Sequence, residues 1–439
     1  MATTALTRSF GTATSTQKFT ISVWVKRSSL ATSGYQNIWH TTDGSYDGYF
    51  RFRNSENQLQ LNMGIASPNT PPNYRTNRIF TDVNAWYHIV AAVDTTLSTA
   101  SDRVKFYVNG TRETSFQSSD APTQNNSYSY LSSSGLGYIG RNATSASNYF
   151  DGSMSHFHFI DGTAYDASPF GSTDSTTGEW KINTSPSVTY GNNGYFILKD
   201  GNSVTDQSGE GNNFTVASGT LTKTEDNPSN VFATMNPLVP TSSLNFSNGN
   251  TTLTGTNATN YSSNNTSTLG ASSGKYYFEI EYDTAGSNTS PSVGISLISI
   301  FPTTNPTGSV SDLVVITMEN QIYVEGTNSA SYLGSTPSTG DIIQIALDMD
   351  NGKVFFGLNG TFVGDPVAGS GSAFSGITSG ETIALNIRPL NAVFKCNFGN
   401  GYFGTTAVSS AGTNASNNGI FEYDVPTGYT ALSTKGLNI

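Results

Sequence analysis

The hairpin IIQIALDMDNGKVFFGLNGT, residues 342–361, decides the fold because the chain holds its pattern twice. An apolar strand ends in Asp348, and the next strand ends in Asn-Gly, the dipeptide that most strongly favours a tight β-hairpin. The same order occurs earlier, where HIVAAVD (88–94) leads over a longer turn into VKFYVNGT (104–111). We therefore predict two sandwiches that share one strand–hairpin–strand plan.

The first turn of this hairpin also resembles the start of a calcium loop. Asp348, Asp350 and Gly352 have the spacing of its opening residues. The bidentate glutamate that ends such a loop should stand at position 359, where the chain has Asn359. We therefore expect a two-residue turn at Asn351-Gly352 and no metal site.

The composition favours an all-β fold. Of the 439 residues 35% are hydrophobic, 12% are aromatic and only 12% are charged, and 44 are Gly. Aromatic and β-branched side chains suit a pleated, half-buried surface, and the many Gly and polar residues suit turns. The aromatic content excludes a disordered chain, and the length predicts two domains, or three if they are small.

The charge, the apolar patterning and the cysteine content of the chain each exclude a class of partner or of covalent link. The net charge is −11, from 20 basic and 31 acidic residues, and no Lys/Arg cluster provides a footprint for nucleic acid. No apolar run reaches the length of a membrane span, and the N-terminus lacks the apolar segment of a signal peptide. The single cysteine, Cys396, cannot form an internal disulfide and is expected to be a small buried hydrophobe.

Alternation of apolar and polar residues marks the strands. In KFTISVWVKRS (18–28), Phe19, Ile21, Val23 and Val25 share one face. Further strands are predicted at 48–54, 58–64, 85–94, 103–110, 136–142, 153–162, 275–283, 292–300, 312–320, 341–350, 353–360, 382–390 and 392–399. No segment has both helical period and helical length, so the predicted fold class is all-β, with two antiparallel β-sandwich domains.

The strands divide the chain into three regions. We predict a β-sandwich over residues 1–170 and a second over 241–439, which ends in a C-terminal tail. Residues 171–240 are rich in Gly, Asn and Ser and predict an irregular connecting region. Its aromatic residues are expected to pack it on its neighbours: Trp180, Tyr195, Phe196 and Phe214.

Three runs of sequence resemble known families. Residues 1–170 resemble the laminin-G/concanavalin-A-like lectin sandwich, a jelly-roll fold, in FTISVWVKR, AWYHIVAAVD, RVKFYVNGT and FDGSMSHFHFIDG. Residues 241–400 resemble a SPRY domain in GKYYFEIEYD, SVGIS and GDIIQIALDMDNGKVFFGLNG. The linking run resembles a module of tailed bacteriophages, many of them marine, in FIDGTAYDASPFGSTDSTTGEWK, GNNGYFILKD, DQSGEGNNFTV, NPSNVFATMNPL and, near the C-terminus, PTGYTALSTKGLN. The resemblance implies a virion structural protein, assembled in the host cytoplasm.

Acidic residues alternate in EIEYD, where Glu279, Glu281 and Asp283 share one face of a strand. Glucanases built on a similar sandwich use such a triplet, so a retaining glycosidase pair is one interpretation. The other is the solvated face of a strand whose apolar residues face the core. We favour the solvated face and expect no catalysis.

The histidines of SMSHFHFIDG, residues 153–162, show the same alternation. His156 and His158 alternate with Phe157 and Phe159. They are therefore expected to be polar-face residues without a special role.

The stretch WHTTDGSYDGYFRFR, residues 39–53, is the candidate for sugar recognition. Two aromatic rings would stack on a pyranose, and charged groups would bond its hydroxyls. The expected carbohydrate-binding residues are Trp39, Asp43, Tyr46, Asp47 and Arg51. Loops on a rigid sandwich carry binding more often than strands do. The alternative is that Trp39 and Tyr49 complete the core.

The resemblance leaves two further sites open. Laminin-G domains often hold calcium at a rim, so calcium near Asp43, Asp47 and Asp151 stays open, although the residues define no ligand set. No other cofactor is expected. In SPRY domains, loops at one end of the sandwich bind protein segments, which here points to 284–291 and 301–311.

Together these observations predict a non-enzymatic virion surface protein. We expect a tail-fibre or fibre-like adhesin that binds host surface glycans; the alternatives are a capsid decoration protein and, further, a glycoside hydrolase on a lectin-like sandwich. The expected partners are other virion proteins and a host polysaccharide, without nucleic acid or membrane insertion. Because fibres are commonly trimeric, we expect a homo-oligomer and leave a trimer open.

Overall fold

A computed structural model describes residues 3–30, 33–64, 72–199, 204–239, 243–257, 263–287, 290–300 and 309–438. The chain divides into two compact units, Met1–Lys223 (unit 1) and Thr224–Ile439 (unit 2). Within the described residues the regular structure consists of strands and four short 3₁₀ helices, η1 (Ala100–Asp102), η2 (Ser129–Leu131), η3 (Ser168–Phe170) and η4 (Gly436–Asn438). No helix in this part of the chain is long and apolar enough to cross a membrane. The predicted all-β fold class is confirmed.

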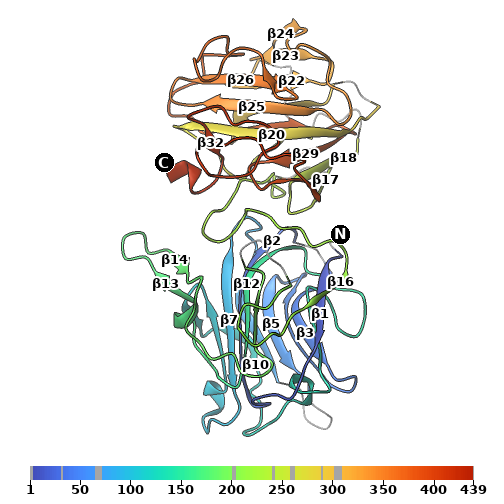
Figure 1. Cartoon of the computed structure of the whole chain (residues 1–439), viewed down its shortest axis with the longest axis vertical. Helices are drawn as coiled ribbons and strands as arrows, with labels where there is room; N and C mark the ends of the chain where they lie inside the picture. The colour runs from blue at the N-terminus through green and yellow to red at the C-terminus, as the bar shows by residue number, and fades with distance from the viewer. Residues whose placement is uncertain are drawn as a thin grey trace. The chain divides into compact units, whose positions relative to one another are not determined.

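Unit 1 is a sandwich of two antiparallel sheets (Figure 1). Among the described residues its large sheet has eight strands in the order β10-β6-β5-β4-β3-β11-β1-β16. These are β1 (Ala5–Ser9), β3 (Tyr35–Thr42), β4 (Asp47–Arg53), β5 (Gln58–Met63), β6 (Asn73–Ile79), β10 (Phe116–Ser119), β11 (Leu136–Ile139) and β16 (Thr215–Ser218).

The second sheet of unit 1 has six described strands in the order β15-β12-β2-β7-β8-β9. These are β2 (Lys18–Arg27), β7 (Tyr87–Asp94), β8 (Val104–Val108), β9 (Thr111–Glu113), β12 (Gly152–Asp161) and β15 (Tyr195–Ile197). A separate hairpin of β13 (Gly171–Thr173) and β14 (Trp180–Ile182) lies beside this sheet in Figure 1.

Unit 2 repeats this plan. Its first sheet has the order β17-β18-β29-β20-β25-β26-β27, with β32 parallel to β20, and its second sheet has the order β19-β28-β21-β22-β23-β24. The first contains β17 (Leu244–Ser247), β18 (Thr252–Gly255), β20 (Lys275–Thr284), β25 (Ile342–Asp348), β26 (Lys353–Leu358), β27 (Thr361–Phe362), β29 (Val393–Asn397) and β32 (Thr430–Ala431). The second contains β19 (Asn265–Thr266), β21 (Ser292–Leu297), β22 (Val314–Thr317), β23 (Gln321–Val324), β24 (Thr327–Ala330) and β28 (Ile383–Arg388). A short pair, β30 (Tyr402–Phe403) and β31 (Thr406–Ala407), stands apart from both.

Each unit has its own core between its two sheets. In unit 1 the predicted inward face of β2 is confirmed, since Phe19, Ile21, Val23 and Val25 are all buried in the core. In unit 2, Ile280 in β20 belongs to the corresponding core. Full burial of such a side chain stabilises the fold by roughly 1.5–3 kcal/mol.

An irregular segment covers the outer face of one sheet in each unit. In unit 1 the covering cluster comprises Val90, Ile160, Ala167, Phe170, Tyr190 and Phe196. In unit 2 it comprises Phe232, Tyr277, Ala346, Phe355, Phe421, Val425, Tyr429 and Ala431. Each sandwich therefore has a third layer, so outward-facing residues of these two sheets are buried as well.

The region predicted to connect the domains is divided between the two units. Residues 171–223 belong to unit 1 and 224–240 to unit 2. Tyr195 and Phe214 enter the core of unit 1, and Met235 enters that of unit 2. The region is thus part of the sandwiches rather than a separate third region, because its aromatic and apolar side chains bury surface even where the backbone forms few strands.

The repeated Asn-Gly turns have the predicted geometry. Asn109 and Gly110 have φ values of 47° and 77°, and Asn359 and Gly360 have 47° and 88°. Positive φ at both central residues defines the type I′ turn of a two-residue hairpin. The hairpin prediction is confirmed in both units.

The turn between β25 and β26 is longer than predicted. Asp348 pairs with Lys353, so the loop spans the four residues 349–352 rather than Asn351-Gly352 alone. The Asp348 carboxylate accepts a hydrogen bond from the Asn351 backbone (3.1 Å), and Asp350 accepts one from Gly274 (2.7 Å). These carboxylates stabilise the turn, which explains their calcium-like spacing.

Candidate functional site

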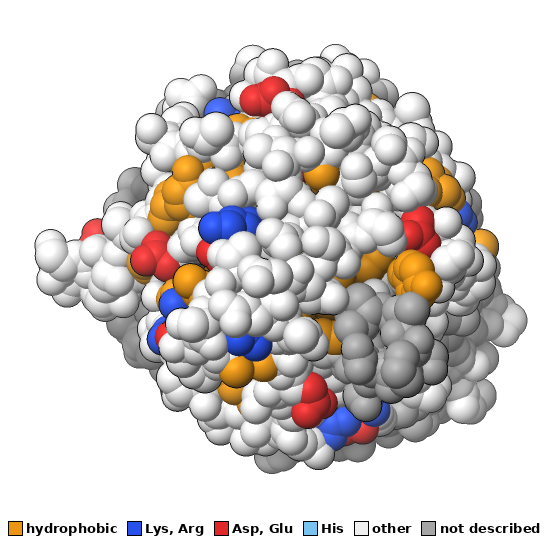
Figure 2. All heavy atoms as spheres, turned by 90° about the horizontal axis from the view of Figure 1, so that it is seen from below, with side chains coloured by type: hydrophobic (Ala, Val, Ile, Leu, Met, Phe, Trp, Pro, Cys, Tyr) orange, Lys and Arg blue, Asp and Glu red, His pale blue; other side chains and the backbone are white. Residues whose placement is uncertain are grey.

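One end of the molecule lacks a large hydrophobic patch among its described residues. In Figure 2 hydrophobic side chains form small, separate groups among polar and backbone atoms. A large contiguous apolar patch would indicate a protein-docking surface. At this end of the molecule a binding site would therefore consist of polar side chains, such as those among the five residues predicted from the sequence.

Trp39 cannot take part in sugar stacking. Its side chain is 1% exposed and lies in the core of unit 1, stacked on Phe159 with ring centroids 5.9 Å apart. Asn37 and Trp39 flank a β-bulge in β3, which turns both Ile38 and Trp39 toward the core. The alternative interpretation of Trp39 as a core residue is the correct one.

Asp43 and Tyr46 form the turn between β3 and β4. Asp43 Oδ1 accepts hydrogen bonds from the backbones of Ser45 (2.9 Å) and Tyr46 (2.7 Å), and Oδ2 accepts one from the Ser129 hydroxyl. Burial by itself would raise the pKa of Asp43, yet these hydrogen bonds hold it below its ordinary value. The Tyr46 ring is partly buried against the core. Both residues therefore have structural roles.

Asp43 and Asp151, near which a calcium site was left open, are engaged in hydrogen bonds of the fold. Asp151 accepts a hydrogen bond from Ser29 (2.8 Å), and Asp43 holds its own turn. Within the part of the chain that the structure describes, no group of three or more His, Cys, Asp or Glu side chains is arranged to hold a metal ion.

Asp47 and Arg51 lie together on the outer face of the large sheet. Alternation along β4 points Phe50 and Phe52 into the core and Asp47, Tyr49 and Arg51 outward. These are the two of the five predicted residues that the structure brings together on one face.

Arg51 is held between two tyrosine rings. Its guanidinium carbon is 3.5 Å from the centroid of Tyr35 and 3.7 Å from that of Tyr49. Its Nε donates a hydrogen bond to Gln60 (3.0 Å). Burial lowers the pKa of Arg51 and raises that of Tyr49. Cation–π contacts on both faces fix the guanidinium plane.

Strand register extends this arrangement across four strands. Asn37, Arg51, Gln60 and Arg75 pair in sequence on β3, β4, β5 and β6. One row away, His40 pairs with Tyr49. We call this group the polar sheet face, defined as Tyr35, Asn37, His40, Tyr49, Arg51, Gln60 and Arg75.

Several polar atoms of the polar sheet face are buried without a hydrogen-bond partner. These are Asn37 Oδ1, His40 Nδ1 and Arg75 Nε. His40 Nε2 lies 3.0 Å from the Asp47 carboxylate, which favours a proton on Nε2 and leaves Nδ1 as an acceptor. An unpaired buried polar group costs roughly 1–3 kcal/mol. Such atoms, beside fixed aromatic rings, are typical of a site that binds a polar ligand.

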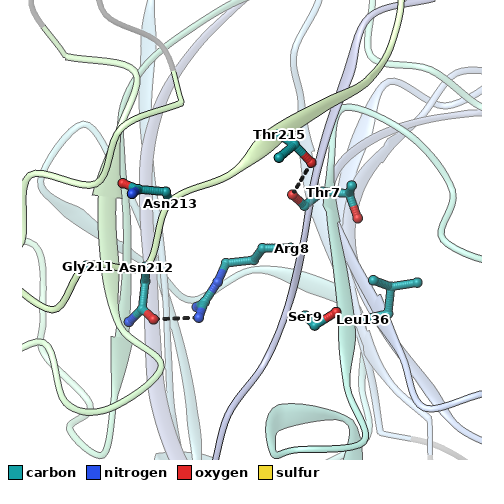
Figure 3. Close-up of a pocket in the computed structure, with 8 residues that line it drawn as sticks. All are labelled: Thr7, Arg8, Ser9, Leu136, Gly211, Asn212, Asn213 and Thr215. Carbon is teal, nitrogen blue, oxygen red and sulfur yellow. Dashed lines mark hydrogen bonds between the residues drawn. The ribbon is translucent and has the colours of Figure 1, made fainter.

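A hollow of about 380 Å³ lies at another edge of unit 1 (Figure 3). In Figure 3 the Arg8 guanidinium points toward Asn212, to which it donates a hydrogen bond. Arg8 also donates to the Asn193 carbonyl (3.1 Å) and lies over the rings of Phe10 and Tyr195. Arg8 thus ties β1 to the segments on both sides of β15, and its hydrogen-bonding groups serve the fold.

The acidic triplet of unit 2 is not the solvated face that we predicted. Glu279 is 0% exposed, and its carboxylate accepts four hydrogen bonds. Two come from the backbones of Glu422 and Tyr423 (both 2.9 Å), one from the Tyr277 hydroxyl (2.9 Å) and one from the Asn397 amide (3.2 Å). Burial raises the pKa of Glu279 to about 7, although these bonds act in the opposite direction. Glu279 anchors the covering segment of unit 2.

The other two members of the triplet share one cation. Lys395 lies 3.4 Å from the Glu281 carboxylate and also contacts Asp283. The three carboxylates are therefore committed to a backbone anchor and to an ion pair, and they do not form the spaced pair in a cleft that glycoside hydrolysis requires.

His156 and His158 are buried, contrary to the prediction. The ring of His158 stacks on Phe196 at 4.0 Å and hydrogen-bonds the Tyr190 hydroxyl (2.9 Å). Burial is the main reason that its pKa lies well below the ordinary value. The covering segment of unit 1 encloses both histidines.

Cys396 is buried, as predicted, and burial raises the pKa of its thiol. Of the two SPRY-type loops, residues 288–289 and 301–308 lie outside the described residues.

The chain matches two protein families, and one match falls within each of the two units. Residues 2–168 match the concanavalin A-like lectin/glucanases superfamily, and residues 275–399 match the SPRY domain. The chain is thus similar to a concanavalin A-like domain in its first part and to a SPRY domain in its second. None of the curated proteins compared with the chain matches its sequence.

Solved structures similar to each part are distant in sequence. A heptameric SAP-like pentraxin from Limulus polyphemus is 14% identical, with 37% of this chain and 71% of that chain covered and a TM-score of 0.27. The SPRY domain of human HERC1 is 19% identical, with 33% and 87% covered and a TM-score of 0.27. A further human SPRY domain is 18% identical, with 33% and 90% covered and a TM-score of 0.26.

Sequence reasoning missed most of the polar sheet face. Tyr35, Asn37 and His40 lie in β3, which was not predicted as a strand, because the bulge places two successive residues in the core and breaks the alternation. The alternation Tyr49, Arg51 in GYFRFRN was visible and could have indicated an outward aromatic–arginine row.

Proposed function

We propose that the protein is a non-enzymatic adhesin of a tailed bacteriophage virion, a tail-fibre or fibre-like component that binds host surface glycans. The polar sheet face of unit 1 is the proposed contact with the glycan. Assembly with other virion proteins and into a homo-oligomer belongs to the same proposal.

One observation carries the glycan-binding part. In a concanavalin A-like domain, the polar sheet face combines ring-stacked Arg51 with the unpaired acceptors Asn37 Oδ1 and His40 Nδ1. Hydroxyl groups of a saccharide would supply the missing donors, and a rigid sheet fixes their positions. Unit 2 supports a binding rather than a catalytic role, because Glu279 holds its covering segment.

The virion assignment is supported by the sequence of the covering segments. The run FIDGTAYDASPFGSTDSTTGEWK, residues 159–181, resembles phage modules, and its Phe170 and Trp180 pack on the second sheet of unit 1. The phage-like motif is thus built into the sandwich, as expected for a protein that evolved as one virion component.

Two measurements test this proposal. The labelled full-length protein on an array of bacterial surface polysaccharides should bind a subset of them, and a density map of the virion should place the chain at the tail. Failure to bind any polysaccharide would overturn the glycan-binding role. A position on the capsid lattice would replace the fibre assignment with capsid decoration.

A further inference from the structure

The charges of the chain are unevenly divided between the two units. Unit 1 holds 15 of the 20 Lys and Arg residues and 16 of the 31 Asp and Glu residues. Unit 2 holds the other five basic and 15 acidic residues. The negative charge thus belongs almost entirely to unit 2, and unit 1 can attract an anion despite the acidic composition of the whole chain.

Arg51 has hydrogen-bonding capacity that the fold does not use. Its faces contact Tyr35 and Tyr49, and its Nε bonds Gln60. Its two terminal nitrogens donate to no described residue, and within the described part of the chain no carboxylate forms an ion pair with it. A guanidinium that is already fixed in orientation loses little entropy when it binds a planar acceptor.

Arg53, two residues along the same strand, shows what a satisfied guanidinium on this face looks like. It donates two hydrogen bonds to the Glu56 carboxylate, from Nε and Nη2, both 3.1 Å long. The pairing holds the pKa of Glu56 at about 2. Arg51 has the same chemistry and the same outward direction but lacks a carboxylate.

Arg75 adds a second positive charge beside Arg51. Gln60 stands between them in register, and Arg75 Nε is buried without a partner. Arg75 bonds the Gln117 side chain but forms no ion pair with a described residue. Two acidic residues of β4 and of the turn after it are already engaged, Asp47 with His40 and Glu56 with Arg53.

We infer that the polar sheet face binds a saccharide that carries a carboxylate, with Arg51 donating both terminal N–H groups to the carboxylate oxygens. Arg75 supplies the second cation, and Asn37 and His40 accept hydrogen bonds from sugar hydroxyls. The inference rests on the proposed glycan binding and names the class of glycan. Two parallel charge-assisted hydrogen bonds select a planar carboxylate over a neutral sugar.

The test compares one polysaccharide with and without its carboxylates. We would measure binding of the full chain to polygalacturonate, to its carboxyl-reduced form and to dextran sulfate. Binding to polygalacturonate should be at least about tenfold tighter than to the reduced form, which corresponds to roughly 1.4 kcal/mol. Arg51→Gln should lose this preference, and Arg51→Lys, which keeps the charge but not the paired N–H groups, should lose most of it.

Arg112→Ala is the matched control. Arg112 lies in β9 on the other sheet of unit 1, exposed and 3.6 Å from Asp102, and its replacement should leave binding unchanged. Fluorescence of the four tryptophans, Trp24, Trp39, Trp86 and Trp180, all in unit 1, reports whether the Arg51 variants fold. If Arg51→Gln does not fold, Arg75→Gln takes its place and should reduce the preference by several-fold.

The outcomes separate the inference from the proposed function. Equal binding to both forms of the polysaccharide would overturn the inferred recognition of a carboxylate, but it would not contradict the proposed glycan binding. Equal or tighter binding to dextran sulfate would show selection by charge alone and would also overturn the recognition of a carboxylate. Absence of binding to these and to all array polysaccharides would overturn the proposed function itself.

Discussion

The second sheet of unit 1 and the first sheet of unit 2 are built alike. Their central orders are β12-β2-β7-β8-β9 and β29-β20-β25-β26-β27. In each, a lysine that opens the long strand pairs with the aspartate that ends its neighbour, Lys18 with Asp94 (3.2 Å) and Lys275 with Asp348 (2.9 Å). The repeat seen in the hairpins thus extends across five neighbouring strands of each sheet.

The two sheets differ in how they hold their covering segments. Ser22 and Glu279 occupy equivalent positions, four residues after the paired lysine. In unit 1 a neutral chain of contacts runs from the Ser22 hydroxyl to His88 (2.9 Å) and on to the Trp180 indole (3.0 Å). In unit 2 the Glu279 carboxylate receives the backbone of the segment directly. Unit 1 thus holds its covering segment through neutral side chains, and unit 2 holds its own through a carboxylate. The stability of the two units should therefore respond differently to mutation and to pH.

Replacement of Glu279 should have the largest effect. Glu279→Gln would turn an amide NH₂ toward backbone N–H groups that now donate to a carboxylate, leaving buried donors unpaired. We expect the free energy of unfolding of unit 2 to fall by about 3 kcal/mol. Calorimetry would measure the loss, and tryptophan fluorescence would assign the transition of unit 1, since every tryptophan lies there.

Glu281→Gln is the control for that change. Glu281 is part-exposed and shares Lys395 with Asp283, so we expect a loss below about 1 kcal/mol. Equal losses in the two variants would show that Glu279 is not the anchor of the segment.

Acidification should change the free energies of unfolding of the two units in opposite directions. Burial raises the pKa of Glu279 to about 7, so its contribution to stability is present below the unfolded pKa and is lost as pH rises through 7. Burial lowers the pKa of His88 to about 3, so its contribution is present above the unfolded pKa of about 6.5 and is lost as pH falls. Between pH 7 and pH 5, unit 2 should gain and unit 1 should lose about 2 kcal/mol from these groups.

Calorimetry with fluorescence at pH 5 and pH 7 would measure both shifts. His158, whose pKa is also lowered chiefly by burial, adds to the loss in unit 1. Transitions that move together in the same direction would contradict the contrast between a neutral and a charged anchor.

Local patterns in the sequence predicted many of the strands and both hairpins, but not the segments that cover the sheets. Alternation in FTISVWVKR identifies the core face of β2, and the Asn-Gly dipeptides identify the hairpins, because both depend on neighbouring residues. His158 and Glu279 read as solvated residues because alternation shows only that they face away from the core. Their burial depends on segments that lie far along the chain.

The candidate site was predicted in part for a related reason. Arg51 and Asp47 were identified from their own short stretch, and they do lie on one face. Trp39 was placed in a loop because a bulge hides the strand that contains it. Asn37 and Arg75 reach the site only through strand register, which no local pattern specifies.

A glycine comparison should give the next largest effect. Gly110 and Gly360 both have left-handed backbones, and an added Cβ would lie 2.3 Å from the Trp180 ring in one and 2.9 Å from the Tyr423 ring in the other. Each alanine substitution costs roughly 1–2 kcal/mol in backbone strain. The loss of stability for Gly110→Ala should lie at or above the upper end of this range, because its added Cβ would be closer to a ring. The loss for Gly360→Ala should lie at the lower end. A larger loss for Gly360→Ala, measured by calorimetry, would contradict this order.

The smallest effect should be the same in both units. Asn109 accepts a hydrogen bond from the His88 backbone (2.8 Å) through its amide oxygen, and Asn359 accepts one from Ile342 (2.9 Å) in the same way. Replacement by glycine keeps the left-handed backbone and removes this bond; Asn359→Gly also removes the exposed bond of 2.7 Å that the Asn359 amide donates to Asp341. Because a solvent-exposed bond adds little, Asn109→Gly and Asn359→Gly should each cost about 1 kcal/mol. Calorimetry of each variant would show the loss in its own unit alone. Equal losses would establish that the two turns are the same structural element, whereas a loss in only one would show that the likeness of the two sheets ends at the backbone.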